Sequence, residues 1–282
     1  MRFFMELAYR GAPFHGWQVQ PHQVSVQSTL EQALSTLLRS TTALTGAGRT
    51  DAGVNARHMV AHFDVAAPSS PDADGNLSGG ADAGVNMSGA KPGKAPDVCS
   101  PTFIRSLNSL IGRDIAVYSI SPVADDAHAR FDACARTYRY FVETRKNPFV
   151  GALAWQAPPR LDFDAMNEAA ALLTTLTDFT SFAKLHSDAR TNICRLDSAR
   201  WVQTGAHSWY FEITADRFLR NMVRAVVGTL VDVGRGKMRP QDILAVAGEK
   251  DRCAAGTSMP AEALFLWRVD YPKEIFTSAL EP

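Results

Sequence analysis

Strand-like and helix-like segments alternate along the whole chain of 282 residues, and this alternation limits the folds that are open to it. Residues 3–9 alternate with the two-residue period of a strand. Apolar residues of the segment 26–38 recur at helical spacing behind Ser25, a residue type suited to the N-cap position. Both patterns return in the second half of the chain. The sequence therefore predicts an α+β protein.

Two halves of similar construction are expected from the remaining segments. Further strands are predicted at 59–65, 115–120, 136–143, 201–202, 209–214 and 264–271, and further helices at 103–110, 163–173 and 218–233. The segments 201–202 and 209–214 form an expected hairpin, and 218–233 is the longest expected helix. We divide the chain into two α/β domains, residues 1–121 and residues 122–282.

The segment 68–101 differs from the rest because it is rich in Ala, Gly, Ser, Pro and Asp and nearly free of large apolar side chains. Such a segment buries too little surface to offset its ordering entropy, so we expect a flexible surface insertion. Within it, the run from Asp82 to Asn86 repeats the run from Asp51 to Asn55. Asp82 lacks the preceding Gly-Arg-Thr, so we assign it no second site.

Composition places the chain among ordinary globular proteins, with 46% hydrophobic and 21% charged residues. No apolar stretch approaches the length of a membrane span, and the N-terminus is charged within six residues, unlike a signal peptide. The four cysteines lie far apart without a C-x-x-C pair, which argues against disulfides and a clustered zinc site. His58 and His62 fall on an expected strand, where a spacing of four does not suit a metal. We expect a cytoplasmic protein.

Basic residues are unevenly distributed, although the formal net charge is zero. A neutral chain argues mildly against a nucleic-acid partner, but the distribution of charge matters more than its sum. On the expected helix near residue 220, positions about 100° apart form an apolar face and an opposite, basic face. The basic face holds Arg217, Arg220, Asn221, Arg224 and Gly228, the glycine leaving room for a partner. This face suits phosphate or carboxylate binding; the alternative is a solvated face whose arginine stems cover the core.

Asp51 lies in a glycine-rich loop, Gly48-Arg49-Thr50-Asp51-Ala52-Gly53, which permits close approach of another chain. The adjacent Arg49 favours an ionised carboxylate, but a simple turn residue has the same local signature. The expected strand near residue 138 places Arg136, Tyr138 and Tyr140 on one face. Aromatic rings beside guanidinium groups suit base stacking and phosphate contact, although tyrosines also simply favour strands.

Taken together and in order, these segments resemble the tRNA pseudouridine synthase A family. The matching blocks are Phe14-His15-Gly16-Trp17-Gln18, Gly48-Arg49-Thr50-Asp51-Ala52-Gly53-Val54, Asn108-Ser109-Leu110 with Arg113-Asp114-Ile115, Ala129-Arg130-Phe131, Tyr138-Arg139-Tyr140, Phe218-Leu219-Arg220-Asn221-Met222-Val223-Arg224 with Gly228-Thr229-Leu230, and Asp251-Arg252. One block alone would not be specific, whereas the ordered series spans nearly the whole chain.

The resemblance implies the pseudouridine synthase fold, with two α/β domains whose antiparallel sheets flank a basic cleft. It implies a homodimer that isomerises uridine to pseudouridine at positions 38–40 of the tRNA anticodon arm, without cofactor or metal. At the matched positions, Asp51 would be the nucleophile, Tyr138 would stack on or abut the target uracil, and Arg224 would pair with Asp51 or the substrate. Arg49 would contact the RNA and help to flip the base, and Arg217 and Arg220 are assigned to substrate binding.

Three departures from the family pattern concern the rim of the expected pocket and leave every proposed catalytic residue in place. Asn55 stands where a histidine is commoner, Arg220 where an aromatic or His is usual, and the segment 258–264 lacks the expected Ala-Pro and Gly-Leu. Two alternatives stay open: a tRNA-binding protein without the chemistry, and a synthase for a different RNA. Attack by Asp51 at uracil C6, attack at ribose C1′ and initial proton abstraction are equally open.

Overall fold

The computed structural model describes residues 1–66, 96–184 and 190–277. Its strands are β1 (Arg2–Tyr9), β2 (Thr45–Gly46), β3 (Asn55–Asp64), β4 (Ile115–Val123), β5 (Ala135–Glu143), β6 (Trp155–Gln156), β7 (Leu196–Gln203), β8 (Ser208–Ala215) and β9 (Leu264–Asp270). The α-helices found in the described residues are α1 (Val26–Leu38), α2 (Pro101–Leu110), α3 (Phe163–Leu173), α4 (Met222–Gly234) and α5 (Asp242–Gly248).

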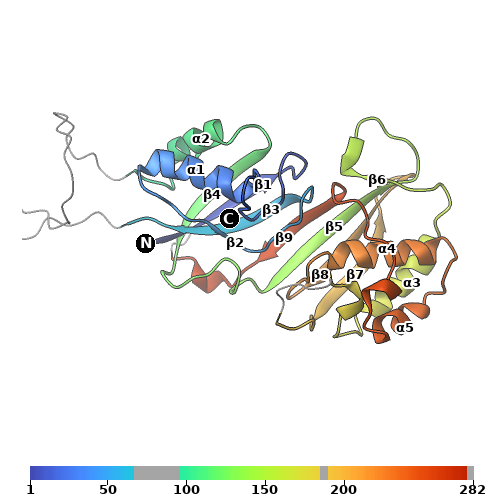
Figure 1. Ribbon diagram of the computed structural model, residues 1–282. Helices are drawn as coiled ribbons and strands as arrows, with labels where there is room; N and C mark the ends of the chain where they lie inside the picture. The colour runs from blue at the N-terminus through green and yellow to red at the C-terminus, as the bar shows by residue number, and fades with distance from the viewer. Residues whose placement is uncertain (67–95, 185–189, 278–282) are drawn as a thin grey trace, which may run out of the picture.

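One sheet runs through both halves of the chain in the order β4-β1-β3-β9-β5-β8-β7, with β2 paired to β3 and β6 to β5 (Figure 1). Its pairings are antiparallel except for two short parallel contacts, between β3 and β9 and between β5 and β6. The last strand, β9, therefore joins the two halves by lying between a strand of each. The predicted α+β class with antiparallel sheet pairing is confirmed.

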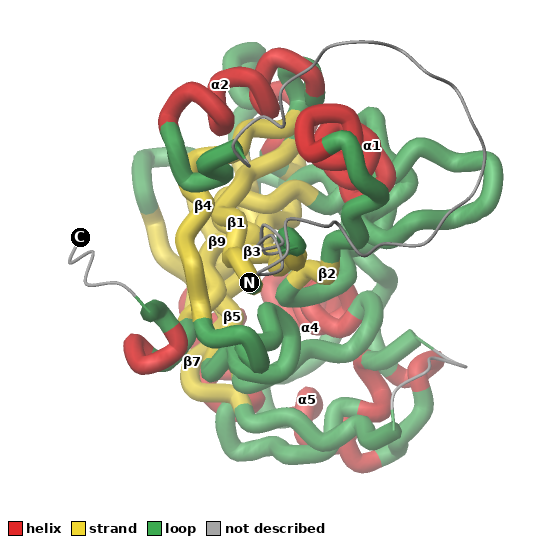
Figure 2. Tube along the Cα trace, turned by 90° about the vertical axis from the view of Figure 1, so that its left-hand side faces the viewer, coloured by secondary structure: helices red, strands yellow, loops and turns green. Residues whose placement is uncertain are grey.

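The helices cover one face of this sheet, and the register shows that the face is continuous. Tyr9 pairs with Ala56, Ala56 with Leu266, and Leu266 with Tyr138, so these four side chains point to the same side. On that side α1 and α2 cover a core with β1, β3 and β4, while α3 and α4 cover a second core with β5, β7 and β8. Figure 2 shows α1 and α4 on the same side of the strands. The two cores meet at Tyr138, which packs against both.

Local sequence signals account for several element boundaries. Ser25 caps α1 in a reciprocal box: its Oγ accepts from the Ser28 N–H at 3.1 Å, and the Ser28 Oγ accepts from the Ser25 N–H at 3.1 Å. Helix α3 covers the predicted residues 163–173, and its first turn is capped by Asp162. The predicted hairpin is confirmed as the antiparallel pair β7–β8.

Among the described helices none is long and apolar enough to cross a bilayer.

The predicted start of the helix near residue 220 is wrong. Asn221 has a left-handed φ of +66°, and the helix begins only at Met222. Arg217 and Arg220 consequently lie in the preceding loop and not on a helix face. Helix α4 has 13 residues, as does α1, so it is not longer than every other helix.

Gly228 was expected to leave room for a partner, and that partner is the backbone of the chain itself. A Cβ atom at this position would lie 1.8 Å from the Thr257 carbonyl oxygen. Gly256, the neighbour of Thr257 in this loop, lies equally close to α4: a Cβ atom on it would lie 2.6 Å from the Gly228 carbonyl carbon. Two glycines therefore allow α4 and the loop 256–262 to touch through their backbones.

Part of the expected insertion is well packed. Residues 68–95, including Asp82, lie outside the described residues. Within 96–101, Val98 is buried and Ser100 caps α2 by accepting from the Phe103 N–H at 3.3 Å. The prediction of a flexible segment up to residue 101 is therefore wrong for its last residues, because one apolar side chain and one helix cap suffice to anchor them.

Candidate active site

Asp51 lies in the loop between β2 and β3, and the backbone on both sides of it is anchored. The hydroxyl groups of Tyr9 and Thr50 share a buried hydrogen bond of 2.8 Å. Beyond Asp51, Gly53 has a φ of +80°, and the Val54 N–H donates to the Asp51 carbonyl at 3.1 Å. The carboxylate therefore projects from a tight turn whose position is fixed by the first strand and by its own backbone.

The Asp51 carboxylate meets the guanidinium of Arg220, which comes from the loop before α4. Arg220 Nε donates to Asp51 Oδ1 at 3.4 Å, and the two side chains are 59% and 26% exposed. An ion pair with this much solvent access contributes little to stability, so a substrate can displace it at low cost. This contact joins residues 169 positions apart in the sequence.

Arg224, the residue that the resemblance pairs with Asp51 or the substrate, lies in the first turn of α4. Its Nε donates to the Met259 carbonyl at 2.5 Å, and the Met259 N–H donates to the Arg224 carbonyl at 3.2 Å. Arg224 thus ties α4 to the loop 256–262, whereas Arg220 contacts Asp51. Both arginines come from the C-terminal half of the chain.

Tyr138 stands on β5 where the two cores meet, and the ring of Phe218 packs edge-on against it at a centroid distance of 4.9 Å. Burial raises the pKa of Tyr138 to about 12, while the charge of Arg136 lowers it and the charge of Asp51 raises it. The phenol is therefore neutral at physiological pH. Phe218 had no role in the sequence analysis; its position two residues before Arg220 in a matched block was the available signal.

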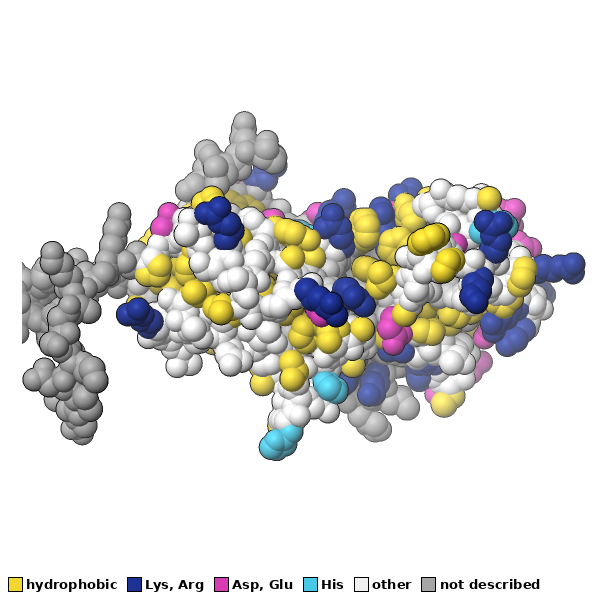
Figure 3. Space-filling model, turned by 90° about the horizontal axis from the view of Figure 1, so that it is seen from above, with side chains coloured by type: hydrophobic (Ala, Val, Ile, Leu, Met, Phe, Trp, Pro, Cys, Tyr) yellow, Lys and Arg dark blue, Asp and Glu magenta, His cyan; other side chains and the backbone are white. Residues whose placement is uncertain are grey.

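A group of four arginines, Arg49, Arg130, Arg136 and Arg217, lies beside this site. Partial burial lowers the pKa of Arg130, and the charges of the other three arginines lower it further. Guanidinium groups that affect one another in this way are close together, and such a group attracts phosphate. Arg130 is a second residue without an assigned role in the sequence analysis. Figure 3 shows Lys and Arg side chains gathered near the middle and right of one face, among apolar side chains.

Asn55, one of the departures from the family pattern, connects two loops beside the Asp51 turn. Its Oδ1 accepts from the Gly11 N–H at 2.8 Å, and its Nδ2 donates to the Glu262 carbonyl at 2.6 Å. A pocket of about 310 Å³ adjoins these loops, within the size range of small-molecule sites. It is lined by Ala12, Pro13, Phe14, His15, Ala52, Gly53 and Glu262.

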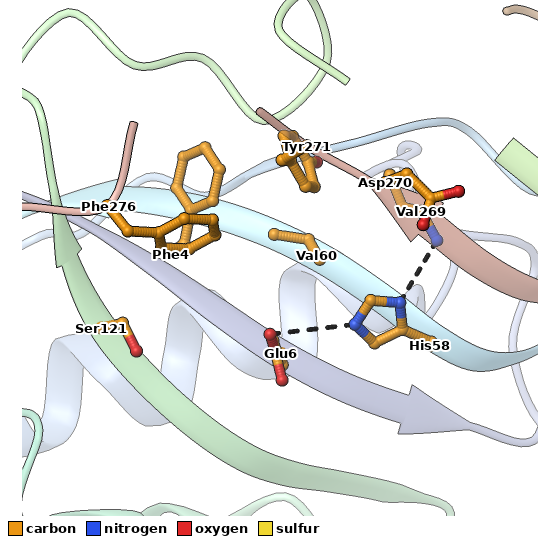
Figure 4. Close-up of a pocket in the computed structure, with 9 residues that line it drawn as sticks. All are labelled: Phe4, Glu6, His58, Val60, Ser121, Val269, Asp270, Tyr271 and Phe276. Carbon is orange, nitrogen blue, oxygen red and sulfur yellow. Dashed lines mark hydrogen bonds and ion pairs between the residues drawn. The ribbon is translucent and has the colours of Figure 1, made fainter. Parts of the chain in front are cut away.

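A smaller pocket of about 140 Å³ lies on the uncovered face of the sheet (Figure 4). Here His58 Nδ1 accepts from the Val269 N–H at 3.2 Å, and its Nε2 lies 3.9 Å from Glu6 Oε1. The pocket is below the usual size of a ligand site and faces away from Asp51, so it is not the candidate active site. In the described parts of the chain, no three His, Cys, Asp or Glu side chains form a group that could hold a metal ion.

Comparison with known proteins shows the family of the chain. The family described as tRNA pseudouridine synthase matches residues 169–272. The chain is 48% identical over 276 residues to tRNA pseudouridine synthase A of Parabacteroides distasonis, covering 98% of each chain. It is 36% identical over 275 residues to tRNA pseudouridine synthase A of Bacillus subtilis, covering 96% of this chain and 99% of the relative. The chain therefore belongs to the tRNA pseudouridine synthase A family, and its mixed sheet with helices on one face agrees with the pseudouridine synthase fold.

Proposed function

We propose that this protein isomerises uridine to pseudouridine at positions 38–40 of the tRNA anticodon arm, with Asp51 as the nucleophile. The observation that supports this most directly is the placing of Asp51: an anchored carboxylate that contacts Arg220 and lies near the half-buried Tyr138. We further propose that residues 1–121 and residues 122–282 act as the two sides of the site. The first side supplies Asp51 and Arg49, and the second supplies Tyr138 and the arginines of the loop before α4.

The reaction breaks the bond between uracil N1 and ribose C1′, turns the base and joins C5 to C1′, while C5 loses its hydrogen as a proton and N1 gains a proton. A carboxylate nucleophile suits a glycosidic centre, as in retaining glycosidases. Asp51 acts as a carboxylate, and Arg220 lies beside it in the free enzyme. The neutral phenol and ring of Tyr138 offer a surface for the flipped uracil, which recovers part of the few kcal/mol lost on unstacking. Nothing in these steps consumes a redox or energy cofactor.

The arginines take different roles in this proposal. Arg220 holds the Asp51 carboxylate in the free enzyme and moves to the RNA when the target nucleotide enters. Arg224 keeps α4 and the loop 256–262 together and faces the substrate from α4. Arg49 and Arg217, with Arg130 beside them, bind phosphates next to the flipped nucleotide, since arginine forms two parallel hydrogen bonds with a phosphate.

The proposal is tested with unmodified tRNA transcripts that carry [5-³H]uridine at one position only. Because the product is joined through C5, its formation releases tritium into water. We expect release from transcripts labelled at 38, 39 or 40 and none from transcripts labelled outside the anticodon arm. Release only from other positions would identify a synthase for a different RNA site. Tight binding of tRNA without release from any position would identify a binding protein without the chemistry.

We also propose that the protein is a cytoplasmic homodimer whose subunits meet through the uncovered sheet face of the C-terminal half. Arg139 lies on that face between two rings, with its Cζ 4.3 Å from the centroid of Tyr210 and 4.2 Å from that of Trp267. Phe141 packs edge-on against Phe265 at 5.2 Å. All four rings are partly exposed, and contiguous exposed aromatics of this kind suit an interface between equal faces.

Trp267→Glu should convert the dimer to a monomer, because it replaces one of the four rings with a carboxylate. Light scattering coupled to size-exclusion chromatography measures the change as a halved mass. Phe149→Glu is the matched control: Phe149 is 96% exposed and lies in the connection between β5 and β6, outside the strands that carry the four rings, so the dimer should persist. A monomeric wild-type protein, or a dimeric Trp267→Glu protein, contradicts the proposed interface.

A further inference from the structure

Arg136 points its guanidinium at four backbone carbonyls, which come from three separate loops. Its Nη1 donates to the carbonyls of Ala133 at 3.1 Å and Asp216 at 2.7 Å. Its Nη2 donates to the carbonyls of Ala47 at 3.0 Å and Arg130 at 2.5 Å. None of these four acceptors is a carboxylate, so the side chain is held by main-chain oxygens whose positions depend on the fold of the loops.

Each of the three loops carries residues of the candidate site. Ala47 begins the loop that leads to Asp51. Ala133 and Arg130 belong to the loop before β5, and Arg130 is a member of the arginine group. Asp216 begins the loop with Arg217 and Arg220. The Asp216 carboxylate also binds backbone: its Oδ1 accepts from the Arg195 N–H at 2.9 Å and from the Arg217 N–H at 2.7 Å.

Arg136 has few donors left for RNA. A guanidinium has five N–H donors in one plane, and here four hydrogen bonds already go to carbonyls. The side chain is partly buried, and burial lowers the pKa of Arg136. Three of these hydrogen bonds, to the carbonyls of Ala133, Asp216 and Ala47, are partly buried, and a carbonyl shielded from water needs a donor. A single arginine therefore donates hydrogen bonds to all three loops and aligns them. No single strand or helix joins one of these loops to another.

We propose that Arg136 is a positioning residue for the isomerisation, which locks the Asp51 loop to the loops that carry Arg130, Arg217 and Arg220. This inference rests on the proposed function for its kinetic part only. A displacement of about 1 Å between reacting groups costs on the order of 100-fold in rate, so loosening these loops reduces the chemical step. A phosphate-binding arginine would instead affect tRNA affinity and its salt dependence.

The test compares Arg136→Met and Arg136→Lys with Arg130→Met. In Arg136→Met we expect kcat to fall about 10- to 100-fold while KM for tRNA changes less than about threefold. In Arg136→Lys, whose ammonium reaches fewer carbonyls, we expect an intermediate loss of kcat. Arg130→Met keeps the carbonyl that Arg136 binds and removes only a guanidinium of the arginine group. It should raise KM and reduce the slope of tRNA binding against salt, with kcat nearly unchanged.

Hydrogen–deuterium exchange provides a readout that needs no activity. Arg136→Met should speed exchange in the segments 44–53, 128–134 and 214–221 together, whereas Arg130→Met and the surface variant Arg239→Met should leave all three as in the wild type. Unchanged exchange in Arg136→Met, or a rise in KM with kcat preserved, overturns the positioning role. If Arg136→Met does not fold, Arg136→Lys carries the same comparison. A wild-type protein that releases no tritium refutes the proposed function, while the exchange pattern still decides the role of Arg136.

Discussion

Asp51→Asn should abolish pseudouridine formation, with a loss of at least about 1,000-fold in kcat. The amide has the shape of the carboxylate but is not a nucleophile, and it cannot form the ion pair with Arg220 that the structure places at 3.4 Å. The turn itself should survive, because it is held by the Tyr9–Thr50 hydrogen bond and the Val54 N–H, neither of which uses the Asp51 side chain. Tritium release from tRNA labelled in the anticodon arm measures the effect.

The sequence offers a matched control in Asp82, which has the same four following residues as Asp51. Asp82→Asn should leave kcat and KM unchanged. Retained activity in Asp51→Asn would disprove the nucleophile assignment. Loss of activity in Asp82→Asn would show that the repeated run around Asp82 takes part in the reaction. Thermal unfolding of both variants should match the wild type, which separates a chemical effect from a folding defect.

Elements that depend on local signals were predictable from sequence. Helix α3 has the predicted bounds because Asp162 caps it and its apolar residues keep one period throughout. The start of α4 was predicted wrongly because the apolar pattern has helical spacing on both sides of Asn221, whose φ of +66° is not helical. Side-chain periodicity reports which residues face the core, and it does not report a left-handed residue at which the chain changes direction.

The candidate site was predictable in its residues but not in its contacts. Asp51 and Tyr138 were identified through the family blocks. The contact of Asp51 with Arg220 depends on the fold of the loop before α4, which the sequence does not show. The role of Arg136 likewise depends on contacts with residues 80 and 89 positions away. The first contact follows from the pairing of β5 with β8, and the second from the insertion of β9 between β3 and β5; no local pattern encodes either pairing.

The largest effect on stability is expected from Gly228→Ala. The added Cβ would lie 1.8 Å from the Thr257 carbonyl oxygen, and both partners are backbone, so neither can yield by changing a rotamer. We expect a loss of more than about 3 kcal/mol, which corresponds to a decrease in Tm on the order of 10 °C. The same shift would separate α4 from the loop 256–262 and break the contact of Arg224 with the Met259 carbonyl. Activity measured well below Tm should therefore fall as well.

Gly248→Ala is the control, because Gly248 is also a helical glycine but has no atom within 4 Å of an added Cβ. There the substitution should change stability by less than about 1 kcal/mol, with a slight gain because alanine is the better helix former. If Gly228→Ala were as stable as Gly248→Ala, the backbone contact between α4 and Thr257 could not be as close as the structure has it.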